Sequence, residues 1–189
     1  LQPAYQYALS NGYSGNKLRP VLENNLSQLL QVNENQVSEG LQYIDMMLAG
    51  AKTGTLHHTQ FHLLSMRDSL SKAIVAYPFF DAQERALVNV NVENDFCYRG
   101  DERYIKLLLF NLIKNSLYYI KAARKGQITI SLIRLEAHNQ LIFEDSGQGI
   151  LAQHLEKIFD RFYSERHGGS GIGLAFCRQV METHGGTIN

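Results

Sequence analysis

Two asparagines stand four residues apart in the middle of an apolar stretch of the sequence. Asn111 and Asn115 lie in the run FNLIKNSLYYI, and in a helix this spacing places both carboxamides on one face. Amide oxygens are hard ligands that suit Mg²⁺, which takes the rest of its shell from water and nucleotide phosphates. The pair therefore predicts a metal and phosphate site, with Lys114 adding positive charge, although two asparagines alone are more often plain surface residues.

A second polar cluster follows a predicted strand. In the run EDSGQGI, Asp145 stands at the strand end, with Gly147 and Gly149 close behind it. The glycines let the backbone approach a planar ligand, while the carboxylate accepts a hydrogen bond from it, and an adenine amine is one such donor. A tight turn capped by an aspartate explains the same residues, so the motif alone leaves both interpretations open.

The third feature is the run HGGSGIGLAF, in which four glycines fall within seven residues, at 168, 169, 171 and 173. The helix that we expect to begin near Leu174 offers unpaired backbone amides to an anion. No Gly-Lys-Ser/Thr follows, so this is not a P-loop. It also does not follow a strand inside a βαβ unit, which argues against a dinucleotide-binding loop.

An aromatic run, IFDRFY, separates the last two features, and a short polar hinge over residues 164–167 follows it. This combination predicts a movable lid anchored by Phe159 and Phe162. Simple packing of both phenylalanines in the core is the alternative.

These residues need elements to position them. Apolar residues recur at helical spacing over residues 17–51 and predict one long amphipathic helix, which needs a partner helix to bury its apolar stripe. The polar segment 52–59 predicts a linker, so we place domains at residues 1–54 and 55–189. The second domain is predicted to contain helices over 63–77, from Asp101 to near Gly126 and over 175–183, with strands over 86–92, 127–135 and 140–144. A layer of helices on one face of a mixed or antiparallel sheet, an α+β fold, accommodates these elements.

Composition narrows the possible functions. The chain has 189 residues, with 18 basic and 18 acidic side chains, so its formal net charge of zero argues against a nucleic-acid partner. No membrane span or signal peptide is visible. Cys97 and Cys177 lie far apart without ligand-like neighbours, which favours a reducing compartment, and we expect a cytoplasmic location.

The order Asn-x3-Asn, Asp-x-Gly-x-Gly, Phe-x2-Phe and Gly-x-Gly-x-Gly-Leu resembles the ATP-binding catalytic domain of bacterial sensor histidine kinases, in the superfamily that includes gyrase and the Hsp90 chaperones. The resemblance runs from about Leu56 to the C-terminus. It implies a Bergerat-type α/β sandwich preceded by a long dimerisation helix. Residues 1–54 resemble part of a dimerisation and histidine phosphotransfer region, and similar domains continue beyond the final GGTIN into another strand, so we expect a truncated domain.

The same resemblance implies roles for individual residues. Asn111 and Asn115 would be catalytic and hold Mg²⁺, and Asp145 would bind the adenine amine of ATP. The further ATP contacts that it implies are Asn115, Tyr119, Gly147, Gly149, Phe159, Phe162, Gly169, Gly171, Ile172, Gly173 and Leu174. Lys114, Arg161, Arg166 and Ser170 are candidate phosphate contacts.

The ATP-hydrolysing branches of the superfamily carry a glutamate general base four residues before the metal-binding asparagine, where this chain has Asn111. Hydrolysis should therefore be slow, and the acceptor of the γ-phosphate should be a histidine. We expect that acceptor upstream of this chain, since none of the seven histidines, at 57, 58, 62, 138, 154, 167 and 184, lies in a recognisable phosphoacceptor motif.

The function implied is the kinase core of a two-component sensor. It would bind ATP, release ADP and phosphorylate the phosphotransfer helix of its own homodimer, for relay to the aspartate of a response-regulator receiver domain. We expect it to be the cytoplasmic portion of a membrane-bound sensor. The run GGSGIGLAFCRQVMETHGG is most similar to hybrid sensor kinases of the quorum-sensing type that detect α-hydroxyketone autoinducers. A nucleotide-binding scaffold without kinase activity and, less favoured, a hydrolytic ATPase are the alternatives.

Overall fold

The computed structural model describes residues 61–165 and 169–189, together with six residues nearer the N-terminus: Leu26, Ser27, Leu30, Asn33, Val37 and Ile44. All six are helical, as the predicted helix over 17–51 requires. The rest of that helix, the linker over 52–59 and the boundary after residue 54 lie outside the described residues, so those predictions stay predictions.

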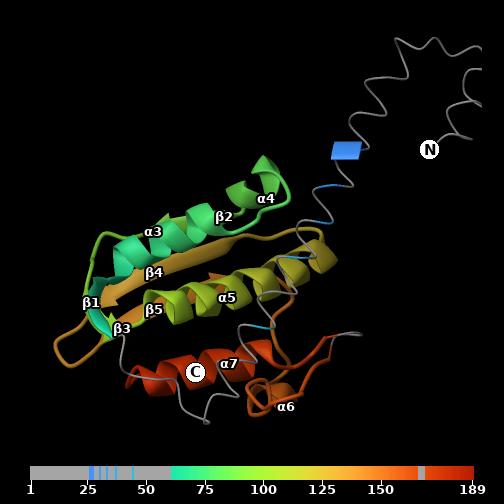
Figure 1. The fold of residues 1–189 in the computed structure, drawn as a ribbon. Helices are drawn as coiled ribbons and strands as arrows, with labels where there is room; N and C mark the ends of the chain where they lie inside the picture. The colour runs from blue at the N-terminus through green and yellow to red at the C-terminus, as the bar shows by residue number, and fades with distance from the viewer. Residues whose placement is uncertain are drawn as a thin grey trace, which may run out of the picture. The chain divides into compact units, whose positions relative to one another are not determined.

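The described domain contains five helices and five strands (Figure 1). In chain order they are β1 (His62–Ser65), α3 (Met66–Ala76), α4 (Ala82–Ala86), β2 (Val88–Asn91), β3 (Cys97–Gly100), α5 (Glu102–Ala123), β4 (Ile128–Arg134), β5 (Asn139–Asp145), the short α6 (Ala152–Leu155) and α7 (Gly173–Thr183).

The strands form two sheets. The larger has the order β2-β4-β5, in which β2 runs parallel to β4 and β4 runs antiparallel to β5, so the predicted mixed sheet is confirmed. Strands β1 and β3 form a separate antiparallel pair. The register of the β4–β5 hairpin places Ile128 opposite Asp145 and Arg134 opposite Asn139. Asp145 therefore lies at the end of the hairpin that is farthest from its turn.

Helix α5 is the centre of the helical layer. It packs between α3 and α7 and contacts β4, as Figure 1 shows. Leu109 and Ile113 are fully buried on α5, and Ile128 and Ile130 are fully buried on β4. Alternate residues of β4 face the helices, which is the pattern of a sheet with one face covered. The predicted α+β fold, with helices layered on a mixed sheet, is confirmed.

Two predicted elements were wrong at their ends. The helix predicted over 63–77 begins only at Met66, since Ser65 caps it by accepting a hydrogen bond from the Asp68 amide at 3.1 Å. The residues before the cap form β1, paired with β3. The strand predicted over 86–92 is limited to Val88–Asn91 because α4 occupies Ala82–Ala86.

Besides β1, three further short elements, α4, β3 and α6, were not predicted. No helix in the described part of the chain is both long enough and apolar enough to cross a bilayer.

Candidate functional site

Asp101 fixes the start of α5, the helix that carries both asparagines. Its carboxylate accepts a hydrogen bond from the backbone N–H of Arg103 at 2.9 Å. It also forms an ion pair with the Arg103 guanidinium at 2.6 Å. Burial alone would raise the pKa of the Asp101 carboxyl, but the side-chain and backbone hydrogen bonds and the charge of Arg103 outweigh it, so the pKa is lowered. The Asp101 N–H also donates to His184 Nε2 at 3.2 Å, which ties the start of α5 to the end of α7.

Asn111 is buried between α5 and α7. Its amide nitrogen donates to the Leu107 carbonyl at 2.8 Å, and this bond determines which way the carboxamide faces. Its oxygen faces Gly173, where a Cβ atom would lie only 2.7 Å away. Asn111 of the predicted asparagine motif and Gly173 of the glycine run, 62 residues apart in sequence, therefore meet at the first residue of α7.

Asn115 lies one helical turn beyond Asn111 and is half-buried, as are Lys114 and Tyr119. No cluster of three or more His, Cys, Asp or Glu side chains in the described ranges could hold a metal ion. A divalent cation at this helix would therefore depend on amide oxygens and on oxygens that a ligand brings. Such a shared shell is the chemistry that suits Mg²⁺ with a nucleotide, and the two asparagine oxygens fit it.

Asp145 is exposed, and hydrogen bonds hold both of its carboxylate oxygens. Oδ2 accepts from the Ser116 hydroxyl at 2.8 Å, and Oδ1 accepts from the Gly147 N–H at 3.0 Å. A Cβ atom at Gly147 would lie 2.9 Å from Asp145 Oδ1 and 3.4 Å from the Cβ of Tyr119. The backbone at Gly147 thus lies directly against α5, and Gly149 is exposed two residues further on.

The glycine run contacts the predicted lid through its backbone. Gly171 has a φ of 64° and Phe162 a φ of 67°, and the Phe162 N–H donates to the Gly171 carbonyl at 2.9 Å. We call this pair of residues the lid clasp. Ser170 accepts a hydrogen bond from the Ile172 amide at 3.4 Å, and Ile172 is the N-cap residue of α7, which Gly173 and the half-buried Leu174 begin.

The two lid phenylalanines differ in their surroundings. Phe159 is buried, with the Arg178 guanidinium 4.7 Å above the centre of its ring. Phe162 is 77% exposed, so only one of the two predicted anchors packs in the core. Arg161 donates to the Gln179 side chain at 3.3 Å, which links the lid to α7. Gly169 is half-buried, and Arg166 lies outside the described residues.

The sequence analysis missed Ser116, which bonds Asp145, and a cluster of three side chains from both sides of the lid, His154, Tyr163 and Glu165. In that cluster His154 Nδ1 lies 2.8 Å from Glu165 Oε1, and the Tyr163 hydroxyl contacts both side chains. Burial raises the pKa of Tyr163, and the hydrogen bond to Glu165 raises it further. The available signal for Ser116 was its place directly after Asn115, in line with the buried residues of α5.

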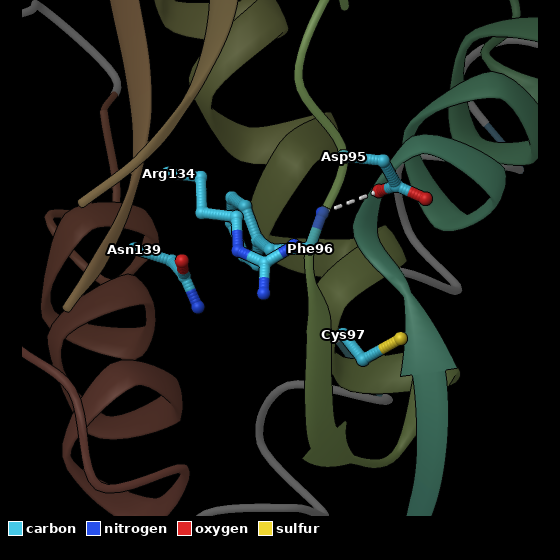
Figure 2. Close-up of a pocket in the computed structure, with 5 residues that line it drawn as sticks. All are labelled: Asp95, Phe96, Cys97, Arg134 and Asn139. Carbon is cyan, nitrogen blue, oxygen red and sulfur yellow. Dashed lines mark hydrogen bonds between the residues drawn. The ribbon is translucent and has the colours of Figure 1, made fainter. Parts of the chain in front are cut away.

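A pocket of about 290 Å³ lies elsewhere, at the turn end of the β4–β5 hairpin. Figure 2 shows its lining residues, Asp95, Phe96, Cys97, Arg134 and Asn139. Asp95 is fully engaged there, since the backbone N–H of Arg67 and the Ser65 hydroxyl both bond it and lower the pKa of its carboxyl. Six residue steps of β4, roughly 20 Å, separate this pocket from Asp145. None of the predicted site residues lines it.

Comparison with known proteins shows what the domain is similar to. Residues 100–189 match the family model described as "Histidine kinase-, DNA gyrase B-, and HSP90-like ATPase". The chain is 33% identical over 164 residues to the CAI-1 autoinducer sensor kinase/phosphatase CqsS of Vibrio cholerae serotype O1 (strain ATCC 39315 / El Tor Inaba N16961). That match covers 86% of this chain and 24% of CqsS, so the chain spans about a quarter of that relative's length.

Solved structures agree on the fold. The catalytic domain of histidine kinase ThkA in its nucleotide-free form superposes with a TM-score of 0.54 at 24% identity, over 67% of this chain and 82% of that one. The structure of ThkA in complex with the response regulator protein TrrA gives a TM-score of 0.56 at 21% identity, over 85% of this chain and 45% of that one. The described domain therefore has the fold of a histidine kinase catalytic domain, and its residues 100–189 are similar to the family of histidine kinase-, DNA gyrase B- and HSP90-like ATPases.

Proposed function

We propose that this chain is part of the kinase core of a two-component sensor histidine kinase, which binds ATP with Mg²⁺ and transfers the γ-phosphoryl group to a histidine. The observation that carries the proposal is the meeting of the predicted motifs around α5. Ser116 of α5 bonds Asp145, and Asn111 of α5 faces Gly173 at the start of α7. The relatives named as sensor kinases, among them CqsS, support the same activity.

In this proposal each motif binds one part of the nucleotide. Asp145 accepts a hydrogen bond from the adenine amine, and Gly147 and Gly149 line the base pocket beside Tyr119. The backbone from Gly169 to Leu174, with Ser170, holds the phosphates at the N-terminus of α7, where the first amides have no partner within the helix. Lys114, Arg161 and Arg166 are the proposed charged contacts to the phosphates.

Asn111 and Asn115 would offer amide oxygens to Mg²⁺, which neutralises phosphate charge when bound. An imidazole nitrogen of the acceptor then attacks the γ-phosphorus, the bond between that phosphorus and the bridging oxygen breaks, and ADP leaves. The neutral amide of Asn111, whose nitrogen is already bonded to the Leu107 carbonyl, is no base for water, so the arrangement supports transfer to a protein acceptor over hydrolysis.

We further propose that the acceptor is a histidine of a phosphotransfer helix, since the described histidines have other contacts. His184 bonds Asp101 and the Val180 carbonyl, His154 bonds Glu165, and His138 bonds Gln140. His62 is exposed in β1 and lies outside any helix. His57, His58 and His167 lie outside the described residues.

The remaining parts of the proposal concern the whole protein. We propose that it is a homodimer, that residues 1–54 contribute to its dimerisation and phosphotransfer region, and that a receiver aspartate accepts the phosphoryl group. ThkA is solved in complex with a response regulator, which supports that kind of partner. We also propose that the chain belongs to the cytoplasmic portion of a membrane-bound sensor. By similarity to CqsS, we propose a role in quorum sensing.

Titration calorimetry with ATP and ADP, with and without Mg²⁺, tests the nucleotide site in the parent chain and in Asp145→Asn. Asparagine has nearly the shape of aspartate but presents an amide nitrogen to the adenine amine, so ATP should bind at least tenfold more weakly. Glu144→Gln is the matched control, because Glu144 is an exposed carboxylate one residue away that points to the other face of β5. Equal ATP affinity in Asp145→Asn and parent would overturn the base-binding role.

Radiolabelled ATP then tests the transfer step, with a phosphotransfer helix supplied. The kinase proposal expects an acid-labile phosphohistidine that forms only with Mg²⁺ and is lost in Asn115→Asp. Tight ATP binding with no transfer would instead favour the nucleotide-binding scaffold, and steady release of phosphate from ATP alone would favour the hydrolytic ATPase.

A further inference from the structure

One hydrogen bond joins the asparagine helix to the carboxylate that is proposed to bind the base. The Ser116 hydroxyl donates to Asp145 Oδ2 at 2.8 Å, across 29 residues of sequence. Ser116 is 4% exposed, so water does not satisfy its hydroxyl. A buried hydroxyl keeps its proton on a protein acceptor, and the exposed carboxylate above it is that acceptor.

The second donor to Asp145 comes from its own loop. The Gly147 N–H bonds Oδ1 at 3.0 Å, so each carboxylate oxygen receives one donor from a different element. Two donors that approach from two sides fix the plane of the carboxylate as well as its position. An ionised carboxylate has about four acceptor sites, and the exposed face of Asp145 keeps the remaining ones directed toward solvent.

We propose that Ser116 is a positioning residue that orients the Asp145 carboxylate for recognition of an adenine base and so contributes to the choice of ATP over GTP. The inference rests on the proposed function, because Asp145 must face the base for its orientation to matter. Adenine presents an amine donor at the position where guanine presents a carbonyl acceptor. A carboxylate held in one orientation attracts the first and repels the second.

The structure gives this bond a second consequence. Ser116 follows Asn115 directly in α5, and the backbone at Gly147 lies against Tyr119 on the same helix. The base loop is therefore fixed to α5 at two neighbouring points, next to the asparagines proposed to meet the phosphate end. Loss of the Ser116 hydroxyl removes one of these two points and frees the carboxylate to rotate.

Nucleotide affinity tests the proposal in Ser116→Ala and in the conservative Ser116→Thr, which keeps the hydroxyl. Calorimetry with ATP and with GTP should give about tenfold weaker ATP binding in Ser116→Ala, with little change for GTP, so that the ATP preference falls about tenfold. Ser116→Thr should keep the parent's preference. An unchanged ATP to GTP ratio in Ser116→Ala would overturn the proposal.

A double-mutant cycle separates positioning from a general loss of structure. If Ser116 acts through Asp145, Ser116→Ala should change ATP affinity less than twofold in the Asp145→Asn background. Equal losses in the two backgrounds would mean that Ser116 supports the fold only, and the proposal would be wrong. The cycle does not depend on whether Ser116→Thr accommodates its extra methyl group.

A readout without nucleotide keeps this inference separable from the proposed function. Amide exchange of Gly147, followed by NMR in the nucleotide-free chain, reports whether its N–H still bonds a fixed carboxylate. Exchange at least fivefold faster in Ser116→Ala than in parent supports the positioning role, and unchanged exchange overturns it. If the parent chain binds neither nucleotide, the proposed function fails, and the Gly147 result still decides whether Ser116 orients Asp145.

Discussion

The lid clasp offers the sharpest test of how the glycine run is built. Gly171 has a φ of 64°, and a Cβ atom added to it would lie 2.4 Å from the carbonyl carbon of Phe162 and 2.6 Å from the amide nitrogen of Tyr163. Both of these are backbone atoms, so no side-chain rotation relieves the contact. Gly171→Ala must therefore push apart the two loop segments that the lid clasp joins.

The free-energy cost of Gly171→Ala has two parts. A left-handed backbone disfavours an alanine by about 1–2 kcal/mol. Separation of the two segments also removes the hydrogen bond from the Phe162 N–H to the Gly171 carbonyl, which contributes about 1 kcal/mol. The local loss is then about 2–3 kcal/mol, which corresponds to an opening equilibrium shifted by roughly 30-fold to 150-fold.

Gly185→Ala is the matched control, because Gly185 has a similar φ of 73° but no atom within 4 Å of its Cβ position. Gly185→Ala therefore has the free-energy cost of a left-handed backbone but no steric clash. Amide exchange of Phe162 is the direct measurement. We expect exchange at least tenfold faster in Gly171→Ala and unchanged in Gly185→Ala, together with weaker ATP binding in the first variant only, if the glycine run holds the phosphates.

Unchanged exchange of the Phe162 amide in Gly171→Ala would refute this reasoning, since it would mean that the clasp adapts to a Cβ atom. Equal effects of the two substitutions on ATP affinity would refute the link between the clasp and the nucleotide.

Other expected outcomes follow from the electrostatics and burial of the domain. Asp101→Ala should lower the free energy of unfolding by about 2 kcal/mol at pH 7, through loss of the cap and the ion pair. Because the pKa of this carboxyl is lowered by folding, the difference from parent in urea denaturation should shrink as the pH falls below about 4, and a constant difference would contradict the assignment. Burial raises the pKa of Cys177 to about 12, so a thiol reagent should react quickly with the exposed Cys97 alone, and two fast thiols in the native protein would argue against this packing. Glu84 is 10% exposed and pairs with the 61% exposed Lys121 at 2.6 Å, so Glu84→Gln should cost about 1 kcal/mol in thermal unfolding and Lys121→Gln less, while the reverse order would count against the pairing.

The elements with long, periodic sequences could be predicted. Helix α5 begins after the Asp101 cap, and its apolar residues recur at helical spacing along its 22 residues. Strand β4 alternates buried and half-buried residues, and the apolar residues of β5 follow it after a polar turn. Strand β1 could not be predicted, because four residues that include the 76% exposed Leu63 become a strand only through pairing with β3, more than 30 residues away. Strand β3 depends on the same distant pairing.

The candidate site, too, could be predicted only in part from the sequence. Motif spacing placed Asp145 at a strand end, as observed, and a helix start near Leu174, where α7 begins one residue earlier at Gly173. Spacing does not give the direction of a side chain, so it did not indicate that the Asn111 oxygen faces Gly173 or that Ser116 bonds Asp145. Nor did it separate the buried Phe159 from the exposed Phe162, whose left-handed backbone depends on its partner in the glycine run.

The parallel pairing of β2 with β4 also bears on how the domain assembles. The hairpin of β4 and β5 closes over a short turn, whereas β2 must wait until β3, α5 and β4 have all been synthesised before it finds its partner. Closing the longer loop costs more chain entropy, so the hairpin should form early and the parallel pair late. Asn111 faces Gly173, so the surface that carries the asparagines is completed only when α7, which is synthesised later still, packs on α5.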